Sequence, residues 1–392
     1  MPEYVIVGGG AAGHSAARTL REEGAEDILL LSRDPDPPYD RTAVTKGYLR
    51  GETSHDEVLL GALDGVDLRV RTSVTKLDPG AHKVTLADRS EAEYGKLLLA
   101  TGANVHRLRI DGAALEGIHY LRTLRTADEV REDAENAGHV LIVGGSYIAT
   151  EVAASLTAIG KRCTIVMQEQ ITLERTFGKQ AGGYFQRVLT DHGVEIHPGQ
   201  EVARFEGEGR VSTAVTKSGE RYEADAVVVG AGVQPDVTLA RAAGLDIGER
   251  GGVVVDSRLR ASAPDVFASG DIAEFESVIR GGERVRIEHW DVAETQGRTA
   301  GLNMLGRDQP HDVIPYFFSD LADWSSMEYI GPAYEWTEEI VRGSIDDGEF
   351  ILYYLDGDRL DGALSIGRSD DLERARELLV SREPVDRKEL AG

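Results

Sequence analysis

The chain has 392 residues, of which 41% are hydrophobic and 28% charged. This length predicts two or three domains, because a single core rarely grows beyond about 250 residues. The formal net charge is −25, which repels phosphate backbones and argues against a nucleic-acid partner. No apolar run approaches the roughly 20 residues that span a bilayer, and no basic, apolar leader opens the sequence. We therefore expect a cytoplasmic protein that does not enter a membrane.

The first predicted elements form a strand, a glycine-rich turn, a helix and a second strand. Residues 4–7 are apolar, and a complete G-x-G-x-x-G follows at Gly8, Gly10 and Gly13. Alanine and leucine then recur at helical spacing up to residue 20, and residues 28–31 are apolar again. A unit of about 30 residues with this order is a βαβ motif.

The same pattern returns in the second third of the chain. Residues 140–143 predict a strand, residues 144–149 a turn, and residues 164–166 the next strand. A buried strand that ends in small residues closes each unit, at Thr101-Gly102 in the first and at Gly232 in the second. The sequence therefore predicts two dinucleotide-binding units in tandem.

The first fingerprint has the residue types that a dinucleotide requires. Gly8 allows the tight turn, Gly10 lets a pyrophosphate approach the backbone, and Gly13 lets the helix pack against the strand. The helix N-terminus then offers free N–H groups to the phosphates. The acidic residue that usually follows the second strand is absent, so we expect either Asp34 to serve one residue late or Arg33 to contact the adenosine.

The second fingerprint departs from the pattern. Gly144 is present, but Ser146 replaces the second glycine and Ala149 the third. Ser146 adds a Cβ where the pyrophosphate comes closest, although its hydroxyl could donate to a phosphate. Met167 occupies the usual acidic position, which leaves Glu169 as the candidate ribose ligand and favours NADH over NADPH. The alternative is a vestigial site that binds nucleotide poorly.

Two dinucleotide units indicate two ligands, and one flavin with one nicotinamide is the natural pairing. After about residue 310 the sequence becomes rich in aromatic residues and in alternating strands, which predicts a smaller α+β domain. We expect an α/β fold with two tandem Rossmann-like domains, similar to glutathione reductase, and this C-terminal domain. The predicted boundaries are 1–111 and 231–308 for FAD, 112–230 for NAD(P)H, and 309–392 for the last domain.

Several motifs in order extend this interpretation over the whole chain. They are residues 8–13, 38–41 with 45–49, 100–102, 120–123, 147–151, 232–235, 269–271, 288–290 and 315–320. With these motifs the sequence resembles the FAD-dependent ferredoxin and rubredoxin reductases of oxygenase systems, the putidaredoxin reductase-like group, and apoptosis-inducing factor. The resemblance implies FAD, a nicotinamide nucleotide and an iron–sulfur protein partner.

The resemblance also implies roles for individual residues. Lys46 is expected near the flavin N5, paired with Glu151, as the catalytic pair. The residues expected to contact FAD are Gly8, Gly10, Ala12, Gly13, Arg33, Arg41, Lys46, Val74, Thr101, Gly102, Arg122, Asp271 and Trp290. The residues expected to contact NAD are Gly144, Ser146, Ile148, Glu151, Glu169 and Gly232. No metal site is expected. Phe318 stands where the family commonly has tryptophan.

Three functions compete at this point. The first is an NADH-dependent reductase of a [2Fe–2S] ferredoxin, or of a rubredoxin, that serves a cytochrome P450 or another oxygenase. Its charge of −25 requires a local basic patch for an acidic ferredoxin, and the arginines of residues 280–286 and 298–307 are candidates. The second is an oxygen-reducing NADH oxidase; its thiol-dependent relatives are disfavoured because Cys163, the single cysteine, lies in a predicted buried strand. The third is a redox sensor like apoptosis-inducing factor.

Overall fold

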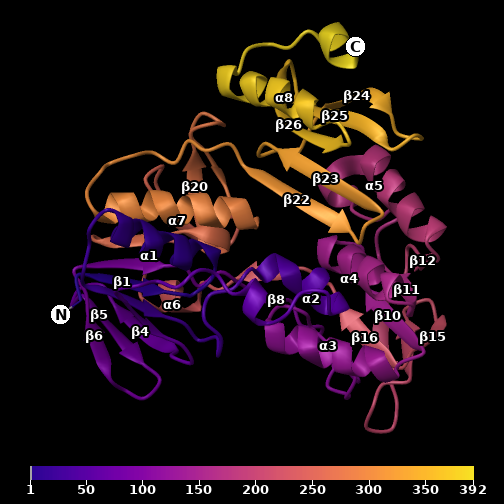
Figure 1. Ribbon diagram of the computed structural model, residues 1–392, viewed down its shortest axis with the longest axis horizontal. Helices are drawn as coiled ribbons and strands as arrows, with labels where there is room; N and C mark the ends of the chain where they lie inside the picture. Colours follow the sequence, from indigo (N-terminus) through magenta and orange to yellow (C-terminus); the bar gives the residue numbers. More distant parts are fainter. Residues whose placement is uncertain (1) are drawn as a thin grey trace. The chain divides into compact units, whose positions relative to one another are not determined.

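The computed structural model describes residues 2–392. The chain forms two compact units, which Figure 1 shows as ribbons and which are described one at a time. Unit 1 comprises the chain up to Asp40 together with Leu59–Asn104 and Gln234–Phe317. Unit 2 comprises Arg41–Val58, Val105–Val233 and Phe318–Gly392. The division into FAD-binding, NAD(P)H-binding and C-terminal domains at the boundaries given above stays a prediction.

A parallel five-stranded sheet forms the centre of unit 1, in the order β19-β7-β1-β2-β3. Its strands are β1 (Tyr4–Val7), β2 (Ile28–Leu31), β3 (Val66–Arg69), β7 (Lys96–Leu99) and β19 (Val266–Ala268). Every residue of β1 and β2 is buried, as expected for parallel strands that are covered on both faces. The carboxyl ends of these strands therefore meet at one edge, where a doubly wound sheet binds its ligand.

Two helices lie side by side in unit 1, α1 (Ala11–Glu22) and α7 (Trp290–Met304) (Figure 1). Their close approach depends on Gly297, because a Cβ there would lie 2.2 Å from the carbonyl oxygen of Ala12. The remaining elements of unit 1 are β4 (Val74–Asp78), β5 (Lys83–Leu86), β6 (Glu91–Glu93), α6 (Thr238–Ala242), β18 (Val253–Val255), η3 (Gly270–Ile272), β20 (Ala273–Ser277) and β21 (Glu283–Val285). β4–β6 and β18, β20 and β21 form two further three-stranded sheets.

Unit 2 repeats the design of unit 1 with a second parallel sheet, in the order β12-β11-β10-β16-β9. Its strands are β9 (Ile118–His119), β10 (His139–Val143), β11 (Arg162–Val166), β12 (Glu195–His197) and β16 (Ala226–Val229). The helices are α2 (Gly47–Arg50), α3 (Leu124–Asn136), α4 (Tyr147–Ala158) and α5 (Glu174–Asp191), with short 3-10 turns η1 (Arg41–Thr45) and η2 (Asp56–Val58). The boundaries between the units fall within β8 (Ala103–Val105), β17 (Val233–Pro235) and β22 (Tyr316–Leu321), and at each end of the segment Arg41–Val58.

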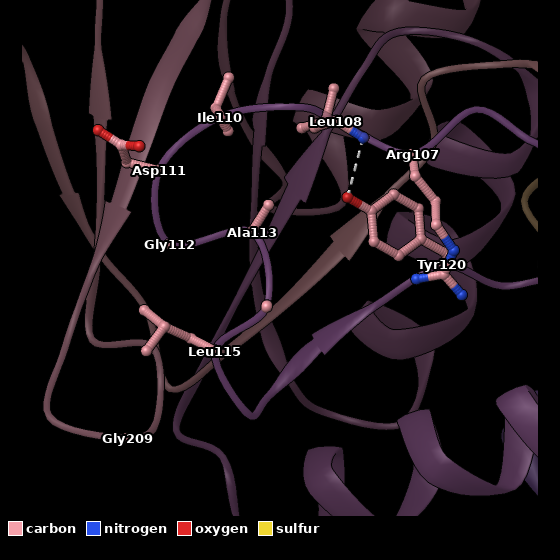
Figure 2. A pocket seen from close by; sticks show the side chains of 10 residues that line it. Arg107, Leu108, Ile110, Asp111, Gly112, Ala113, Leu115, Tyr120 and Gly209 are labelled. Carbon is pink, nitrogen blue, oxygen red and sulfur yellow. Dashed lines mark hydrogen bonds between the residues drawn. The ribbon is translucent and has the colours of Figure 1, made fainter.

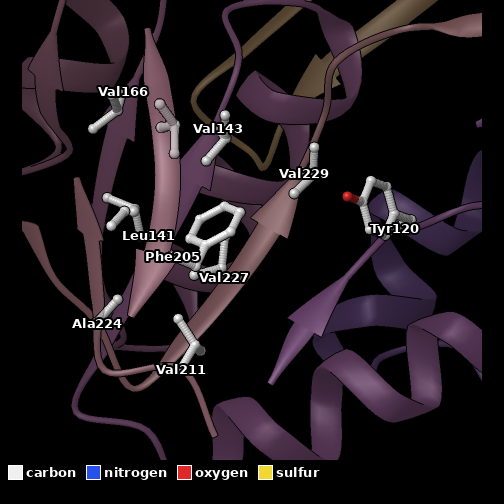
Figure 3. Close-up of a cluster of buried hydrophobic side chains, with 11 residues drawn as sticks. Tyr120, Leu141, Val143, Val166, Phe205, Val211, Ala224, Val227 and Val229 are labelled. Carbon is white, nitrogen blue, oxygen red and sulfur yellow. The ribbon is translucent and has the colours of Figure 1, made fainter. Parts of the chain in front are cut away.

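One hydrophobic core of unit 2 lies between this sheet and a small antiparallel sheet formed by β13 (Val202–Glu206), β14 (Thr213–Thr216) and β15 (Arg221–Glu223) (Figure 3). Figure 3 shows Leu141, Val143 and Val227 of the parallel sheet turned towards Phe205 of the small sheet. All of these side chains are buried. The carboxyl ends of β10 and β16 are thereby fixed from one face.

The chain ends in an antiparallel five-stranded sheet, in the order β22-β23-β26-β25-β24, with two helices. Its elements are β22 (Tyr316–Leu321), β23 (Ser325–Ile330), β24 (Glu338–Ser344), β25 (Glu349–Asp356), β26 (Arg359–Ile366), α8 (Ser369–Ser381) and α9 (Arg387–Ala391). The helix α5 packs against this sheet, where the buried Tyr354 hydroxyl donates to the carbonyl of Phe177 at 3.0 Å. Gly178 breaks α5 at this point with φ 77°. These features confirm the predicted fold class.

Candidate dinucleotide and redox sites

The first glycine-rich turn leaves space only where a pyrophosphate is expected. At Gly8, with φ 118°, a Cβ would lie 2.1 Å from the carbonyl oxygen of Ala100. At Gly13 a Cβ would lie 1.9 Å from the carbonyl oxygen of Gly8. At Gly10, in contrast, no atom lies within 4 Å of that position. Gly8 and Gly13 are therefore required by packing, whereas Gly10 keeps an opening beside the backbone.

The start of α1 matches an anionic ligand at this opening. Gly10 is the N-cap and offers no side chain to the first N–H groups, and the first turn of α1 contains no acidic residue. These N–H groups and the helix dipole attract a phosphate. The residues present therefore fit the pyrophosphate of FAD.

A group of polar contacts links the predicted FAD residues Arg33, Thr101 and Gly102. The Arg33 guanidinium donates to Asp236 at 2.8 Å and to Asn104 at 2.6 Å. The Thr101 hydroxyl donates to the carbonyl oxygen of Asp236 at 2.9 Å, and the N–H of Asp236 donates to the Gly102 carbonyl at 2.8 Å. Sequence reasoning missed Asp236 and Asn104, which hold Arg33 at the end of β2.

The turn around Gly270 contains the next predicted contact, Asp271. Gly270 has φ 77°, and its N–H donates to the side-chain oxygen of Gln296 at 2.8 Å. The Ser269 hydroxyl and the Gln296 side-chain nitrogen are buried without a hydrogen-bond partner among the described residues. The turn is thus built from polar groups whose hydrogen-bonding capacity is not used up by the protein.

Trp290, another predicted FAD contact, is the first residue of α7, and Val74 is the first residue of β4. The preceding residue, His289, stacks on Phe317 with ring centroids 4.0 Å apart. Burial lowers the pKa of His289 to about 4, against the opposing effect of Asp271. His289 is therefore neutral at physiological pH.

The second turn, in unit 2, keeps the geometry of the first but has a side chain at the position of the opening. At Gly144, with φ 120°, a Cβ would lie 2.4 Å from the carbonyl oxygen of Gly230. Ser146 stands at the position of Gly10, and its hydroxyl donates to the same carbonyl at 3.0 Å. Ser146 is also the N-cap of α4, whose first turn contains Ile148 and no acidic residue. The anion-binding end of the helix is kept, while the serine side chain takes up space beside it.

The strand-end residues of unit 2 lie next to this turn. A Cβ at Gly145 would lie 2.6 Å from the sulfur of the buried Met167 and 3.6 Å from Oε2 of Glu169. Glu169 forms an ion pair with Arg175, whose Nε lies 3.2 Å from Oε1 of the carboxylate. The structure thus places the predicted ribose ligand, Glu169, beside the turn. Gly232, with φ 87° and no atom within 4 Å of a Cβ, follows the end of β16.

Lys46 lies between two carboxylates in unit 2. Its Nζ is 3.1 Å from Oδ2 of Asp320, within hydrogen-bond distance, and 3.6 Å from Oε1 of Glu151. The ring of Phe318 lies under the ammonium group, 4.6 Å from Nζ to the centroid. The structure brings the predicted pair Lys46 and Glu151 together, and it adds Asp320 as the partner that accepts the lysine hydrogen bond.

Two hydroxyl groups hold the buried Glu151 independently of the lysine. Thr45 donates to one carboxylate oxygen at 2.6 Å, and Ser319 donates to the other at 2.5 Å. A third hydroxyl, that of Ser155, donates to the Thr45 carbonyl at 2.6 Å. Sequence reasoning missed Thr45, Ser319 and Asp320 as site residues, although they lie within the motifs at residues 45–49 and 315–320.

Arg41 and Arg122, the two remaining predicted FAD contacts, lie together in unit 2. The Arg41 guanidinium donates to the Arg122 carbonyl at 2.7 Å. The Arg122 N–H in turn donates to the hydroxyl of Thr126 at 3.0 Å, within the capping box that starts α3. The two arginines are therefore ordered by the start of this helix.

The single cysteine takes no part in these sites. Cys163 is buried in β11, and burial raises the pKa of its thiol to about 11. A thiol in this state is a poor nucleophile.

A pocket of about 640 Å³ lies in unit 2, formed mainly by residues 107–115 (Figure 2). Figure 2 shows the Tyr120 ring beside Arg107, with its hydroxyl accepting a hydrogen bond from the N–H of Leu108 at 3.1 Å. None of the residues that line this pocket is a predicted nucleotide contact. It is therefore distinct from the fingerprint turns.

The chain has two fingerprint turns on two parallel sheets, a lysine–carboxylate cluster and an inert cysteine. These features define a flavoprotein oxidoreductase that uses a pyridine nucleotide. The family model described as pyridine nucleotide-disulphide oxidoreductase matches residues 2–297, and the model described as reductase C-terminal matches residues 316–392. The chain belongs to the pyridine nucleotide-disulphide oxidoreductase family.

Individual relatives match over the full length. The chain is 33% identical to the 5,5'-dehydrodivanillate O-demethylase ferredoxin reductase subunit of Sphingobium sp., covering 100% of this chain and 97% of that protein. It is 32% identical to rhodocoxin reductase of Rhodococcus erythropolis, covering 97% and 90%. Among solved structures, the covalent putidaredoxin reductase–putidaredoxin complex matches with a TM-score of 0.94 at 29% identity, covering 100% of this chain and 96% of that chain. Among residues 2–392, no helix has the length and hydropathy that a membrane crossing requires.

Proposed function

We propose that this chain is an NADH-dependent reductase that delivers electrons to a [2Fe–2S] ferredoxin of an oxygenase or cytochrome P450 system. The observation that carries the proposal is the residue cluster around Lys46. Residues 39–49, where thiol-dependent flavoenzymes need a cysteine next to the flavin, contain none, and Lys46 lies there between Asp320 and Glu151. Electrons therefore leave for an external carrier and not for an enzyme disulfide.

FAD, when bound, supplies the chemistry that side chains lack: it takes up two electrons as hydride and releases them one at a time. The role proposed for Lys46 is electrostatic, because a fixed ammonium group stabilises negative charge that develops beside it. Thr45 and Ser319 hold the Glu151 carboxylate by hydrogen bonds, and Asp320 holds the ammonium group in place. The site residues predicted for FAD and NAD remain part of this proposal.

The preference for NADH is proposed from the end of β11. The Glu169 carboxylate lies beside the second turn, where a ribose hydroxyl of NADH can donate to it. A 2′-phosphate in the same place would face a carboxylate of like charge. NADPH is therefore expected to be the poorer donor.

Because the protein has a net charge of −25, an acidic ferredoxin needs a local basic patch on its surface in order to dock. The arginines of residues 280–286 are a weak candidate, because each is paired with a glutamate. Arg280 lies 2.7 Å from Glu283 and Arg284 lies 3.1 Å from Glu276, and Arg286 contacts Glu288. Paired charges of this kind leave little positive field for steering.

A steady-state assay of the FAD-loaded protein with NADH, cytochrome c and a purified [2Fe–2S] ferredoxin tests the proposal. Cytochrome c reduction that depends on the ferredoxin and rises with its concentration supports it. The same assay with a rubredoxin in place of the ferredoxin tests the alternative electron carrier. NADH consumption in air that no carrier accelerates would favour an NADH oxidase instead. Slow turnover with a long-lived absorption at long wavelength would favour a sensor like apoptosis-inducing factor.

A further inference from the structure

The segment that joins β11 to α5 is fastened to the second glycine-rich turn. The N–H of Leu173 donates to the carbonyl oxygen of Gly145 at 2.8 Å. Leu173 has φ 58°, a left-handed conformation that a leucine rarely adopts. This bond and the dihedral angle set where α5 starts, and so they set the position of Arg175 in its first turn.

Arg175 is the cation that lies against the predicted ribose ligand. Its Nε is 3.2 Å from Oε1 of Glu169, while the other carboxylate oxygen lies 3.6 Å from the Cβ position of Gly145. The Glu169 side chain is 20% exposed and that of Arg175 is 79% exposed. The Arg175 side chain is therefore mostly exposed to solvent beside the carboxylate with which it pairs.

An arginine near the end of this strand is the group that accommodates the 2′-phosphate of NADP in dinucleotide-binding folds. Its planar fork matches a phosphate through two parallel hydrogen bonds. Here the neighbouring carboxylate neutralises the arginine and repels the same phosphate. The two residues thus have opposite preferences for the two coenzymes, and Glu169 decides the outcome.

We infer that Arg175 is a coenzyme-specificity residue whose affinity for a 2′-phosphate is masked by Glu169. The inference rests on the proposed function, because it takes the second turn to be the nicotinamide nucleotide site. It goes further in assigning a role to Arg175 and in treating the ion pair as the unit that selects NADH.

Binding of 2′,5′-ADP and of 5′-AMP, measured by calorimetry, isolates the contribution of the 2′-phosphate without turnover. The variants are Glu169→Gln, Arg175→Ala and the double variant, and the control is Lys179→Ala, which removes another exposed cation of α5. Glu169→Gln is expected to raise the affinity for 2′,5′-ADP relative to 5′-AMP about tenfold, the usual scale of one charge-assisted contact. The double variant is expected to lose that gain, and Lys179→Ala to leave the ratio unchanged.

Kinetics with NADH and NADPH give the second readout, as a shift of kcat/KM towards NADPH in Glu169→Gln that disappears in the double variant. A gain that survives the removal of Arg175 would overturn the inference. An equal loss of affinity for both nucleotides in Arg175→Ala would also overturn the inference, because the arginine would then contact the adenosine 5′-phosphate that they share. A wild-type protein that binds neither nucleotide and does not respond to NADH would overturn the proposed function, and this inference with it.

Discussion

Lys46 gives its hydrogen bond to Asp320, at 3.1 Å, while Glu151 lies at 3.6 Å. The expected pair thus supplies two charges of a three-charge group in which a single ammonium contacts two carboxylates. Glu151 has Thr45 and Ser319 as additional donors. Asp320 therefore does more than Glu151 to fix where the lysine points.

Replacing Asp320 with alanine is expected to slow the reduction of bound FAD by NADH about tenfold, since a hydrogen bond to a charged group contributes about 1.5–3 kcal/mol. Asp320→Glu should recover part of the rate, because it restores the charge. The measurement is anaerobic stopped-flow absorbance, together with the midpoint potential of the flavin. The matched control is Asp323→Ala, which removes an exposed carboxylate from the same segment. Equal rates and potentials in the two variants would show that Asp320 does not position the lysine.

Substitutions of Gly13 and of Gly10 in the first turn are expected to have different effects. Gly13→Ala places a Cβ 1.9 Å from the carbonyl oxygen of Gly8, so it should lower the free energy of unfolding of the apoprotein by about 1–3 kcal/mol. Gly10→Ala meets nothing within 4 Å, so the apoprotein should keep its Tm while its Kd for FAD rises. Chemical denaturation and fluorescence titration with FAD measure the two effects. An unchanged Kd in Gly10→Ala would mean that the pyrophosphate does not lie at this opening.

Ser146→Gly is expected to lower the stability of the protein and to raise its affinity for NADH. The variant loses the hydrogen bond from the hydroxyl to the Gly230 carbonyl at 3.0 Å, which contributes about 1 kcal/mol to stability. It also removes the Cβ at the closest approach of the pyrophosphate, so the Kd for NADH should fall. Equilibrium unfolding and NADH titration are measured on the same samples. Weaker binding of NADH would show that the serine hydroxyl contacts the phosphate instead.

Two histidines, the buried His311 and the half-buried His289, predict a loss of stability in acid. Burial lowers the pKa of both His289 and His311 to about 4, while an unfolded histidine has a pKa of about 6.5. Between these values the unfolded state binds more protons, so stability is complete above pH 6.5 and falls as the pH drops towards 4. The full loss is about 3 kcal/mol for each histidine. His311→Gln should flatten the pH dependence of the unfolding free energy, whereas His106→Gln, at an exposed residue, should leave its slope unchanged.

The sequence predicted the two sheets because their signals are local. Apolar strands, glycine turns and helical spacing each occupy fewer than about 30 residues in a βαβ unit, and the structure has them at Gly8 and at Gly144. The partners of the site residues are not local. Asp320 lies 274 residues after Lys46 in the sequence, and Asp236 lies 203 residues after Arg33. No periodicity encodes which of several carboxylates will lie against a given cation, so these contacts required the structure.

The residues that set the coenzyme preference were likewise only partly predictable from the sequence. Met167 at the acidic position suggested an altered site, and the nearby Glu169 suggested NADH. The ion pair with Arg175 was not expected, because an arginine six residues further on belongs to the next helix. The position of Arg175 depends on the left-handed backbone conformation of Leu173, and a leucine in a sequence does not indicate that conformation.

The most direct test of the account is to mix the FAD-loaded protein anaerobically with NADH, and separately with NADPH, and to follow the flavin absorbance by stopped flow. We predict rapid bleaching with NADH and much slower bleaching with NADPH, followed by reoxidation when a [2Fe–2S] ferredoxin is added. No bleaching with either nucleotide, or only slow conversion into a persistent long-wavelength band, would contradict it, because the second turn would then not deliver hydride at a useful rate.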